Sequence, residues 1–360
     1  MPNLVTTYQL IADILSFDSS DTQLKQTLTQ PNVDWDALVT EGSRHLVLPA
    51  IYCRLKSRAL LNLLPKDLAT YLDEITTINR NRNSAIIEQA KSLAHLFNSH
   101  NIEHVFLKGT ALLALNCYED NAERMIGDID ILIPKHQVQT AYKLAQENGY
   151  NPIKSTLGER FFEHKHLPRM VPVAHMAAIE LHIKLFVTYK YDTLLPENVL
   201  NKKNTDALLN IPSKAHLLYH NVLNQQINDK GKLYKNISFR AAYDSIILLK
   251  LNDKDLIAEA LNTHIFKSYF KHLSLFFNYL SWDLDIQPNL STKFYLFKLK
   301  HRKFHIFHNK FLSFFSFLWI VLGRVYLFIT NSMYRKAVLA DRKRILEHFK
   351  NKVFLKNENL

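Results

Sequence analysis

The sequence contains few of the residues that interrupt helices or form cross-links. Its 360 residues include 7 glycines, 11 prolines and 2 cysteines. The scarcity of glycine and proline excludes collagen-like and Pro/Gly-rich disordered chains, and it disfavours a β-sandwich, which needs many turn residues. Cys53 and Cys117 are too few for a disulfide scaffold or a four-cysteine zinc site. The first twenty residues lack the basic start and apolar run of a secretory signal, so we expect a cytoplasmic protein.

The net charge of +12 belongs to one end of the chain. Residues 291–360 contain 15 Lys and Arg but 3 Asp and Glu. This leaves 30 of the 45 basic and 30 of the 33 acidic residues for residues 1–290, which therefore carry no net charge. Any attraction to nucleic acid or to a membrane is expected from the C-terminal fifth alone.

Hydrophobic periodicity indicates an α+β fold. The apolar residues of 67–97 recur at helical spacing without Gly or Pro, which predicts a long helix. Short apolar, β-rich runs predict strands at 102–107, 128–133 and 179–183. From these patterns we predict a helical region, a small α/β core, a helical domain and a basic aromatic helical tail, at residues 1–98, 99–195, 196–290 and 291–360.

Asp128 and Asp130 are the strongest chemical signal in the sequence. They lie on a predicted strand with one apolar residue between them, so their side chains point to the same face. Such a carboxylate pair repels itself unless a cation lies between, and hard carboxylate oxygens suit Mg²⁺ or Mn²⁺. Taken alone, the pair is also compatible with solvated residues at a sheet edge.

A strand-to-helix turn twenty residues upstream adds features that suit a phosphate. Lys108, Gly109 and Thr110 follow the first predicted strand. Glycine lets a phosphate approach the backbone, a helix start offers free N–H groups, and lysine adds a point charge. Arg124 suits a pyrophosphate oxygen, and Glu180 on a later strand offers a third carboxylate. The alternatives are an ordinary turn, a surface arginine and an amphipathic strand.

Together these motifs resemble a known family. The quoted residues are Val105-Phe-Leu-Lys-Gly-Thr-Ala-Leu-Leu, Tyr118, Arg124, Asp128-Ile-Asp-Ile-Leu-Ile and Glu180-Leu-His182. They resemble the uncharacterised bacterial nucleotidyltransferase family of the DNA polymerase beta-like nucleotidyltransferase superfamily. That superfamily has Gly-Ser at a helix start, Asp-x-Asp on the next strand and a third acid on a later strand; here Gly109-Thr110 replaces Gly-Ser. The resemblance covers about residues 85–190 and implies a minimal nucleotidyltransferase mixed sheet with flanking helices.

The resemblance also implies a reaction and roles for the residues. The reaction is transfer of a nucleoside monophosphate from an NTP, with ATP expected, to an acceptor hydroxyl, with release of pyrophosphate. The implied catalytic residues, which would also bind two Mg²⁺ ions, are Asp128, Asp130 and Glu180. The implied nucleotide-binding residues are Lys108, Gly109, Thr110 and Arg124. Behind them we place His182, Arg240 and Asp244, with a structural salt bridge as an equal alternative for the last two.

The basic tail contains an apolar run, residues 311–330, with one charge, Arg324. A transmembrane helix has adequate length but is opposed by this arginine. The run also suits an interfacial helix on an anionic membrane surface, or a helix buried in the protein core. Because no nucleic-acid-binding module is recognisable, RNA ranks below these interpretations. We therefore expect a cytoplasmic protein that is peripheral at the inner membrane face if the interfacial interpretation holds.

Two classes of function remain open at this point. The first is a Mg²⁺-dependent enzyme that acts on a small molecule, a glycan precursor or a protein hydroxyl. The second is a catalytically silent nucleotide-binding or membrane-associated scaffold with the same fold. The complete acid set of Asp128, Asp130 and Glu180 favours the enzyme.

Overall fold

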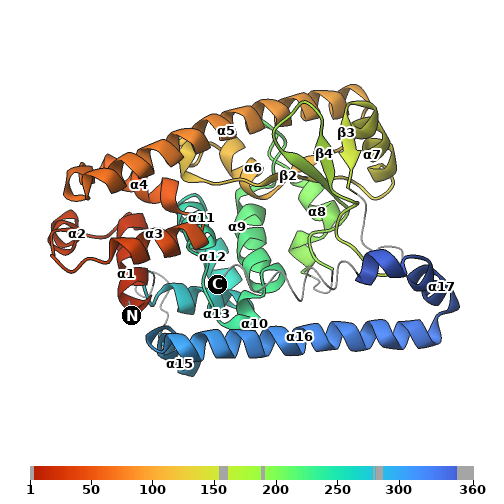
Figure 1. The fold of residues 1–360 in the computed structure, drawn as a ribbon. Helices are drawn as coiled ribbons and strands as arrows, with labels where there is room; N and C mark the ends of the chain where they lie inside the picture. Colours follow the sequence, from red (N-terminus) through yellow and green to blue (C-terminus); the bar gives the residue numbers. More distant parts are fainter. Residues whose placement is uncertain (1–3, 154–160, 188–190, 279, 281–286, 347–360) are drawn as a thin grey trace. The chain divides into compact units, whose positions relative to one another are not determined.

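The computed structural model describes residues 4–153, 161–187, 191–278, 280 and 287–346 (Figure 1). The chain forms two compact units. The first comprises Met1–Pro152 and Lys165–His305, and the second comprises Ile153–His164 and Ile306–Leu360. The domain boundaries predicted after residues 98, 195 and 290 all fall inside the first unit, and they stay a prediction.

Helices precede the sheet in the first unit. They are α1 (Leu4–Leu15), α2 (Asp21–Leu28), α3 (Trp35–Arg44), α4 (Leu48–Ser57), the short 3₁₀ helix η1 (Leu61–Leu63) and α5 (Lys66–Ser99). The predicted long helix is α5, whose 34 residues bury apolar side chains such as Leu72, Ile86 and Phe97 along one side. These residues recur at helical spacing, so their burial against one core stabilises the helix.

The sheet has five strands in the order β1-β2-β5-β4-β3. The strands are β1 (Val105–Phe106), β2 (Asp128–Leu132), β3 (Tyr150–Pro152), β4 (Met170–Pro172) and β5 (Ala178–His182). The pair β2–β5 is parallel, and the other pairs are antiparallel. Helices α6 (Lys108–Ala114) and α7 (Val138–Glu147) and the 3₁₀ helix η2 (Asn121–Glu123) connect the first strands. This mixed open sheet between helical regions confirms the predicted α+β class.

Polar side chains of α5 form hydrogen bonds with the backbone of the loop that leads into β2. Asn79 donates to the Ala122 carbonyl at 2.6 Å, and Asn83 donates to the Arg124 carbonyl at 2.7 Å. Both asparagines are buried, so these bonds satisfy groups that would otherwise be costly to bury. The residues just before Asp128 are therefore held by a helix that ends before the sheet begins.

The rest of the first unit is helical. It contains η3 (Asp192–Leu194), α8 (Pro196–Asn201), α9 (Lys214–Leu223), the π-helix η4 (Asn224–Asn228), α10 (Gly231–Tyr234), α11 (Phe239–Lys250), α12 (Lys254–Leu261), α13 (His264–Leu273) and α15 (Leu290–Lys300). Tyr295 and Leu299 of α15 are buried in the core. Because these residues pack in the first unit, the start of the basic region contributes to the folded core.

The second unit contains most of α16 (Arg302–Thr330), α17 (Ser332–Ala340) and a segment near Phe161. Tyr334 is buried there, with the rings of Phe161 and Phe162 at centroid distances of 5.0 and 6.2 Å. In contrast, α16 has no buried residue. The apolar surface of this helix is therefore uncovered in the described part of the chain.

Candidate functional site

Parallel pairing of β2 and β5 brings acidic side chains together. In this register Asp130 lies opposite Glu180, and Asp128 lies two residues before Asp130 on the same face of β2. The flanking Ile129 and Ile179 are fully buried and hold both strands in the core. The side chains of Asp128, Glu180 and Asp130 are 30%, 14% and 3% exposed, so the acidic face runs from solvent into the protein.

Asp130 is the most enclosed of these acids and has two cationic or hydrogen-bonding partners. Its Oδ1 lies 2.5 Å from Lys108 Nζ and 2.8 Å from His182 Nε2. Burial by itself would raise the pKa of Asp130, but the Lys108 ammonium and the His182 hydrogen bond hold that pKa well below its usual value. The same attraction raises the pKa of Lys108 against the effect of its own burial. Asp130 is therefore a carboxylate, and Lys108 an ammonium, at neutral pH.

The other two acids differ in their electrostatics. A hydrogen bond from His182 lowers the pKa of Glu180 against the effect of burial, and His166 Nε2 lies 3.5 Å from Glu180 Oε2. Asp128 shows the opposite shift: burial first, and then the charges of Asp130 and Glu180, raise its pKa. Arg169 Nη2, 3.8 Å from Asp128 Oδ2, offsets this repulsion in part. Lys165 also interacts with Asp130 and Glu180, so the three acids face three basic side chains, Lys108, Arg169 and Lys165.

A metal ion would fit the inner end of this face. Asp130, Glu180 and His182 each offer one ligand atom, and these atoms lie within 4.8 Å of one another. The two carboxylates suit Mg²⁺ or Mn²⁺, whereas an imidazole nitrogen is a ligand typical of zinc, iron, copper and nickel. Asp128 is outside this group but on the same strand face. The predicted ligands Asp130 and Glu180 are thus brought together. His182 lies close enough to them to be a ligand itself.

The Lys108-Gly109-Thr110 turn forms the first residues of α6, directly after β1, so the predicted passage from strand to helix is present. Lys108 has a φ of 50°, which turns its backbone sharply at the strand end. A Cβ on Gly109 would lie 2.9 Å from Ile126 Cγ1, so packing requires glycine here. Thr110 is 1% exposed, and its hydroxyl has no hydrogen-bond partner among the described residues. The phosphate-binding roles of this turn stay predictions, and the structure adds a packing reason for its glycine.

Arg124 and Asp244 form a buried ion pair. Arg124 Nε lies 2.9 Å from Asp244 Oδ2, and the Tyr118 hydroxyl donates to Asp244 Oδ1 at 2.7 Å. These residues come from the loop before β2 and from α11, so the pair joins the sheet to the helical part of the same unit. Asp244 therefore forms a salt bridge, which was the structural alternative for this residue, but its partner is Arg124 rather than Arg240.

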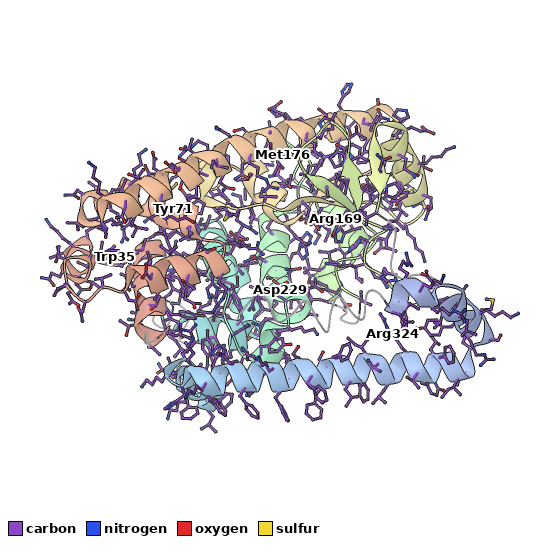
Figure 2. The ribbon with its side chains drawn as sticks, viewed as in Figure 1. Trp35, Tyr71, Arg169, Met176, Asp229 and Arg324 are labelled. Carbon is purple, nitrogen blue, oxygen red and sulfur yellow. The ribbon has the colours of Figure 1, made fainter. Side chains whose placement is uncertain are left out.

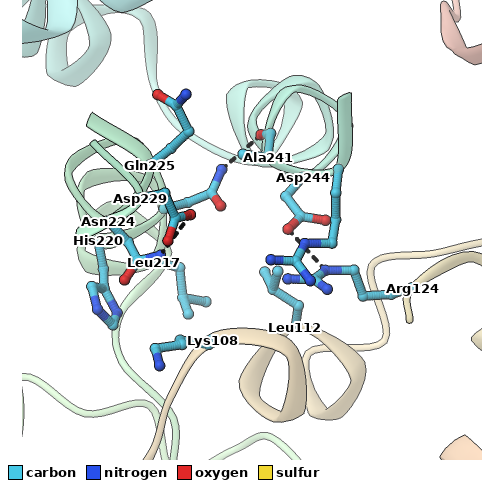
Figure 3. A pocket seen from close by; sticks show the side chains of 12 residues that line it. Lys108, Leu112, Arg124, Leu217, His220, Asn224, Gln225, Asp229, Ala241 and Asp244 are labelled. Atoms are coloured by element: carbon cyan, nitrogen blue, oxygen red, sulfur yellow. Dashed lines mark hydrogen bonds and ion pairs between the residues drawn. The ribbon is translucent and has the colours of Figure 1, made fainter. Parts of the chain in front are cut away.

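A cavity of about 50 Å³ lies beside this pair (Figure 3). Lys108 lines one wall, the Arg124–Asp244 pair another, and Arg240 and Asp229 complete its charged lining. Burial, and then the charge of Arg124, lowers the pKa of Arg240. Within the described ranges no carboxylate lies within 4.0 Å of Arg240, so its guanidinium is available to an anion.

His166 and Arg169 are site residues that were not identified from sequence. They approach the acids from the segment before β4, which carries no recognisable motif. His220 of α9, which belongs with Arg240 and Asp244 in the resemblance to the family, lines the cavity; burial, followed by the charge of Lys108, lowers its pKa to about 3, so it is neutral. A single histidine or arginine in an irregular segment gives no periodic signal in the sequence, so only the three-dimensional fold shows that it lies at the site.

A family model described as uncharacterised nucleotidyltransferase matches residues 31–280, which is more than half of the chain. The matched range contains the acids of β2 and β5, the Lys108 turn and the cavity of α9 and α11. No curated protein matches the chain.

Proposed function

The chain belongs to the uncharacterised nucleotidyltransferase family, and from this premise we propose that it is a Mg²⁺-dependent enzyme that transfers a nucleoside monophosphate from an NTP to an acceptor hydroxyl. Family membership supports the nucleotidyl-transfer role. The metal, ATP as the donor and a hydroxyl on a small molecule, glycan precursor or protein are our proposal. Pyrophosphate is the second product.

The observation that carries the proposal is the juxtaposition of Asp130, Glu180 and His182 beside Lys108. A carboxylate pair on adjacent parallel strands, with ligand atoms within 4.8 Å, is expensive to bury unless cations neutralise it. Asp128, Asp130 and Glu180 would hold the divalent ions, and His182 would orient Asp130 or join the ligands. Bound ions would neutralise phosphate charge and lower the pKa of the acceptor hydroxyl.

The residues of the chain itself have separate tasks in this proposal. Lys108, 2.5 Å from Asp130, is close enough to exchange that carboxylate for a phosphate oxygen. Arg240 binds the same phosphate chain from the cavity wall, and Arg124 stays with Asp244 and shapes that wall. Glu180 accepts the proton of the acceptor hydroxyl, and His166 at 3.5 Å passes it towards solvent.

The alternative is a scaffold that binds nucleotide without turning it over. Such a protein could lose any one acid without losing its fold, whereas an enzyme needs Asp128, Asp130 and Glu180 together. The presence of all three on one face supports the enzyme. Turnover, rather than nucleotide binding, distinguishes the two functions.

The test combines binding with turnover on the full-length chain. We expect Mg²⁺ with ATP to raise the thermal midpoint, because a ligand that binds only the native state stabilises it. α-Labelled ATP should transfer its label to acceptors in a cell extract. Asp130→Asn should abolish transfer, while the matched surface variant Asp67→Asn should retain it. Stabilisation by Mg²⁺-ATP without transfer of any NTP label would favour the scaffold, and full activity of Asp130→Asn would refute the proposal.

A further inference from the structure

Helix α16 exposes a continuous apolar stripe. It is 29 residues long, about 43 Å, and an 18-residue window has a mean hydropathy of 2.0 with 0% buried in the described structure. The stripe consists of exposed side chains spaced three or four residues apart: Phe307, Phe311, Phe314, Leu318, Leu322, Val325 and Ile329. Their spacing places them on one side of the helix. An exposed apolar surface of this kind is typical of a binding surface.

The charges around the stripe indicate what covers it. Residues 286–340 contain nine Lys and Arg and no Asp or Glu. Lys303, Lys310 and Arg324 on α16 and Lys336 on α17 are exposed. A surface that combines hydrocarbon with dense negative charge matches this arrangement, and an anionic lipid bilayer is such a surface. We propose that α16 lies in the plane of an anionic bilayer, with its apolar stripe among the acyl chains.

The opposite side of α16 is less apolar than the stripe. Asn309, Ser313, Ser316, Gly323 and Thr330 share this side, with Ile320 and Leu327 between them. Arg324 lies beside Gly323 on the border of this side, and its guanidinium lies over the ring of Phe162, away from the stripe. Figure 2 labels this arginine on α16.

Chain connectivity distinguishes an in-plane helix from a spanning one. At the end of α16, Arg324 lies 5.8 Å from the Phe162 ring centroid, and Tyr334 packs on Phe161 and Phe162. Phe162 is three residues from Lys165, which is about 10 Å of extended chain at most. A bilayer's hydrocarbon core is about 30 Å thick. Three residues cannot cross that core, so the contact of Phe161 and Phe162 with this end of α16 favours a helix in the plane of the bilayer over one that spans it.

The test is co-sedimentation of the full-length protein with vesicles of phosphatidylcholine, with or without phosphatidylglycerol. Wild type should bind the anionic vesicles, and salt should weaken this binding only in part, because burial of the stripe is not screened. Phe314→Glu with Leu318→Glu should reduce binding at least roughly tenfold, since it places two carboxylates in the acyl layer. Ser313→Glu with Ser316→Glu adds the same charge on the opposite side and should bind more tightly than the stripe variant.

Three results would overturn the proposal. The first is wild type that does not sediment with anionic vesicles. The second is a dimer in light scattering that the Phe314→Glu/Leu318→Glu variant dissociates, since a second copy would then cover the stripe. The third concerns orientation: added to preformed vesicles, Ser332→Cys should react with an impermeant maleimide, and reaction only after lysis would indicate a spanning helix. Phe314→Ser with Leu318→Ser repeats the first comparison without added charge, so a folding defect of the Glu variant leaves the proposal testable.

Discussion

The buried pair of Arg124 and Asp244 allows a quantitative prediction. Asp244 is 1% exposed and accepts from Arg124 at 2.9 Å and from Tyr118 at 2.7 Å. Asp244→Asn keeps the shape of the side chain but leaves the Arg124 guanidinium, 10% exposed, without a counter-charge. Removing one partner of a buried pair costs about 3–5 kcal/mol. Because Arg124 retains its hydrogen bond to the Met125 carbonyl, we expect about 3 kcal/mol, at the lower end.

The measurement is urea unfolding of the full chain, followed by circular dichroism. Asp229→Asn is the matched control, because it removes a carboxylate from the same cavity lining at an exposed position, and it should change stability by less than about 0.5 kcal/mol. Arg124→Met should resemble Asp244→Asn. The double variant Arg124→Met with Asp244→Leu should be more stable than either single variant, since no buried charge remains unpaired. Additive losses, or single losses below about 1 kcal/mol, would refute the reasoning that this is a buried, coupled pair.

Three further predictions concern the turn, the site and the pH dependence. Lys108→Ala should weaken Mg²⁺-ATP binding at least roughly tenfold in calorimetry, since hydrogen bonds to charged groups contribute about 1.5–3 kcal/mol; equal affinity would return Lys108 to a purely structural role with Asp130. Gly109→Ala should destabilise the fold by about 1–3 kcal/mol because its Cβ would press on Ile126. Gly127→Ala, whose Cβ would meet nothing within 4 Å, is its control, and equal losses in urea unfolding would contradict the packing argument. Burial raises the pKa of Glu123 from its usual 4.5 to about 7, so the native state binds the extra proton and stability should fall by roughly 3 kcal/mol as pH rises from 4.5 to 7. Glu123→Gln should flatten that part of the pH–stability curve, and an unchanged slope would assign it to other groups.

The elements of the fold could largely be predicted because their patterns are local. The helical spacing of apolar residues marks α5, and the alternation of Asp128, Ile129 and Asp130 marks β2. Both patterns arise because a helix or strand has one period and one buried face. The turn from strand to helix at Lys108 was predicted for the same reason. The assignment of these motifs to a nucleotidyltransferase family, first suggested by resemblance, is confirmed by the family match over residues 31–280.

Local patterns did not predict the pairing of strands or the hydrogen-bond partners of each acid. β2 and β5 are separated by β3 and β4 in the sequence, yet they pair in parallel and bring Glu180 beside Asp130, a grouping that only the resemblance to the family implied. We expected Lys108 to bind a phosphate group, and in the fold its ammonium forms an ion pair with Asp130. His182 shares this carboxylate, which makes it a closer participant than its position in the sequence indicates. Such contacts depend on how segments far apart in the sequence come together, and the periodic pattern of a single segment carries no information about this.

The sequence by itself determined which residues could carry the chemistry and where the charge lies: the acids of β2 and β5, the Lys108 turn and the basic aromatic end of the chain. Tertiary structure alone decided that Arg124 pairs with Asp244, 120 residues away, and that α5 fastens the loop before β2. It also separated the two parts of the basic end, since α15 is packed in the core while α16 has no buried residue. The physical reason is that residue type and spacing decide what a segment can form, whereas burial and pairing depend on which other segments come to lie against it.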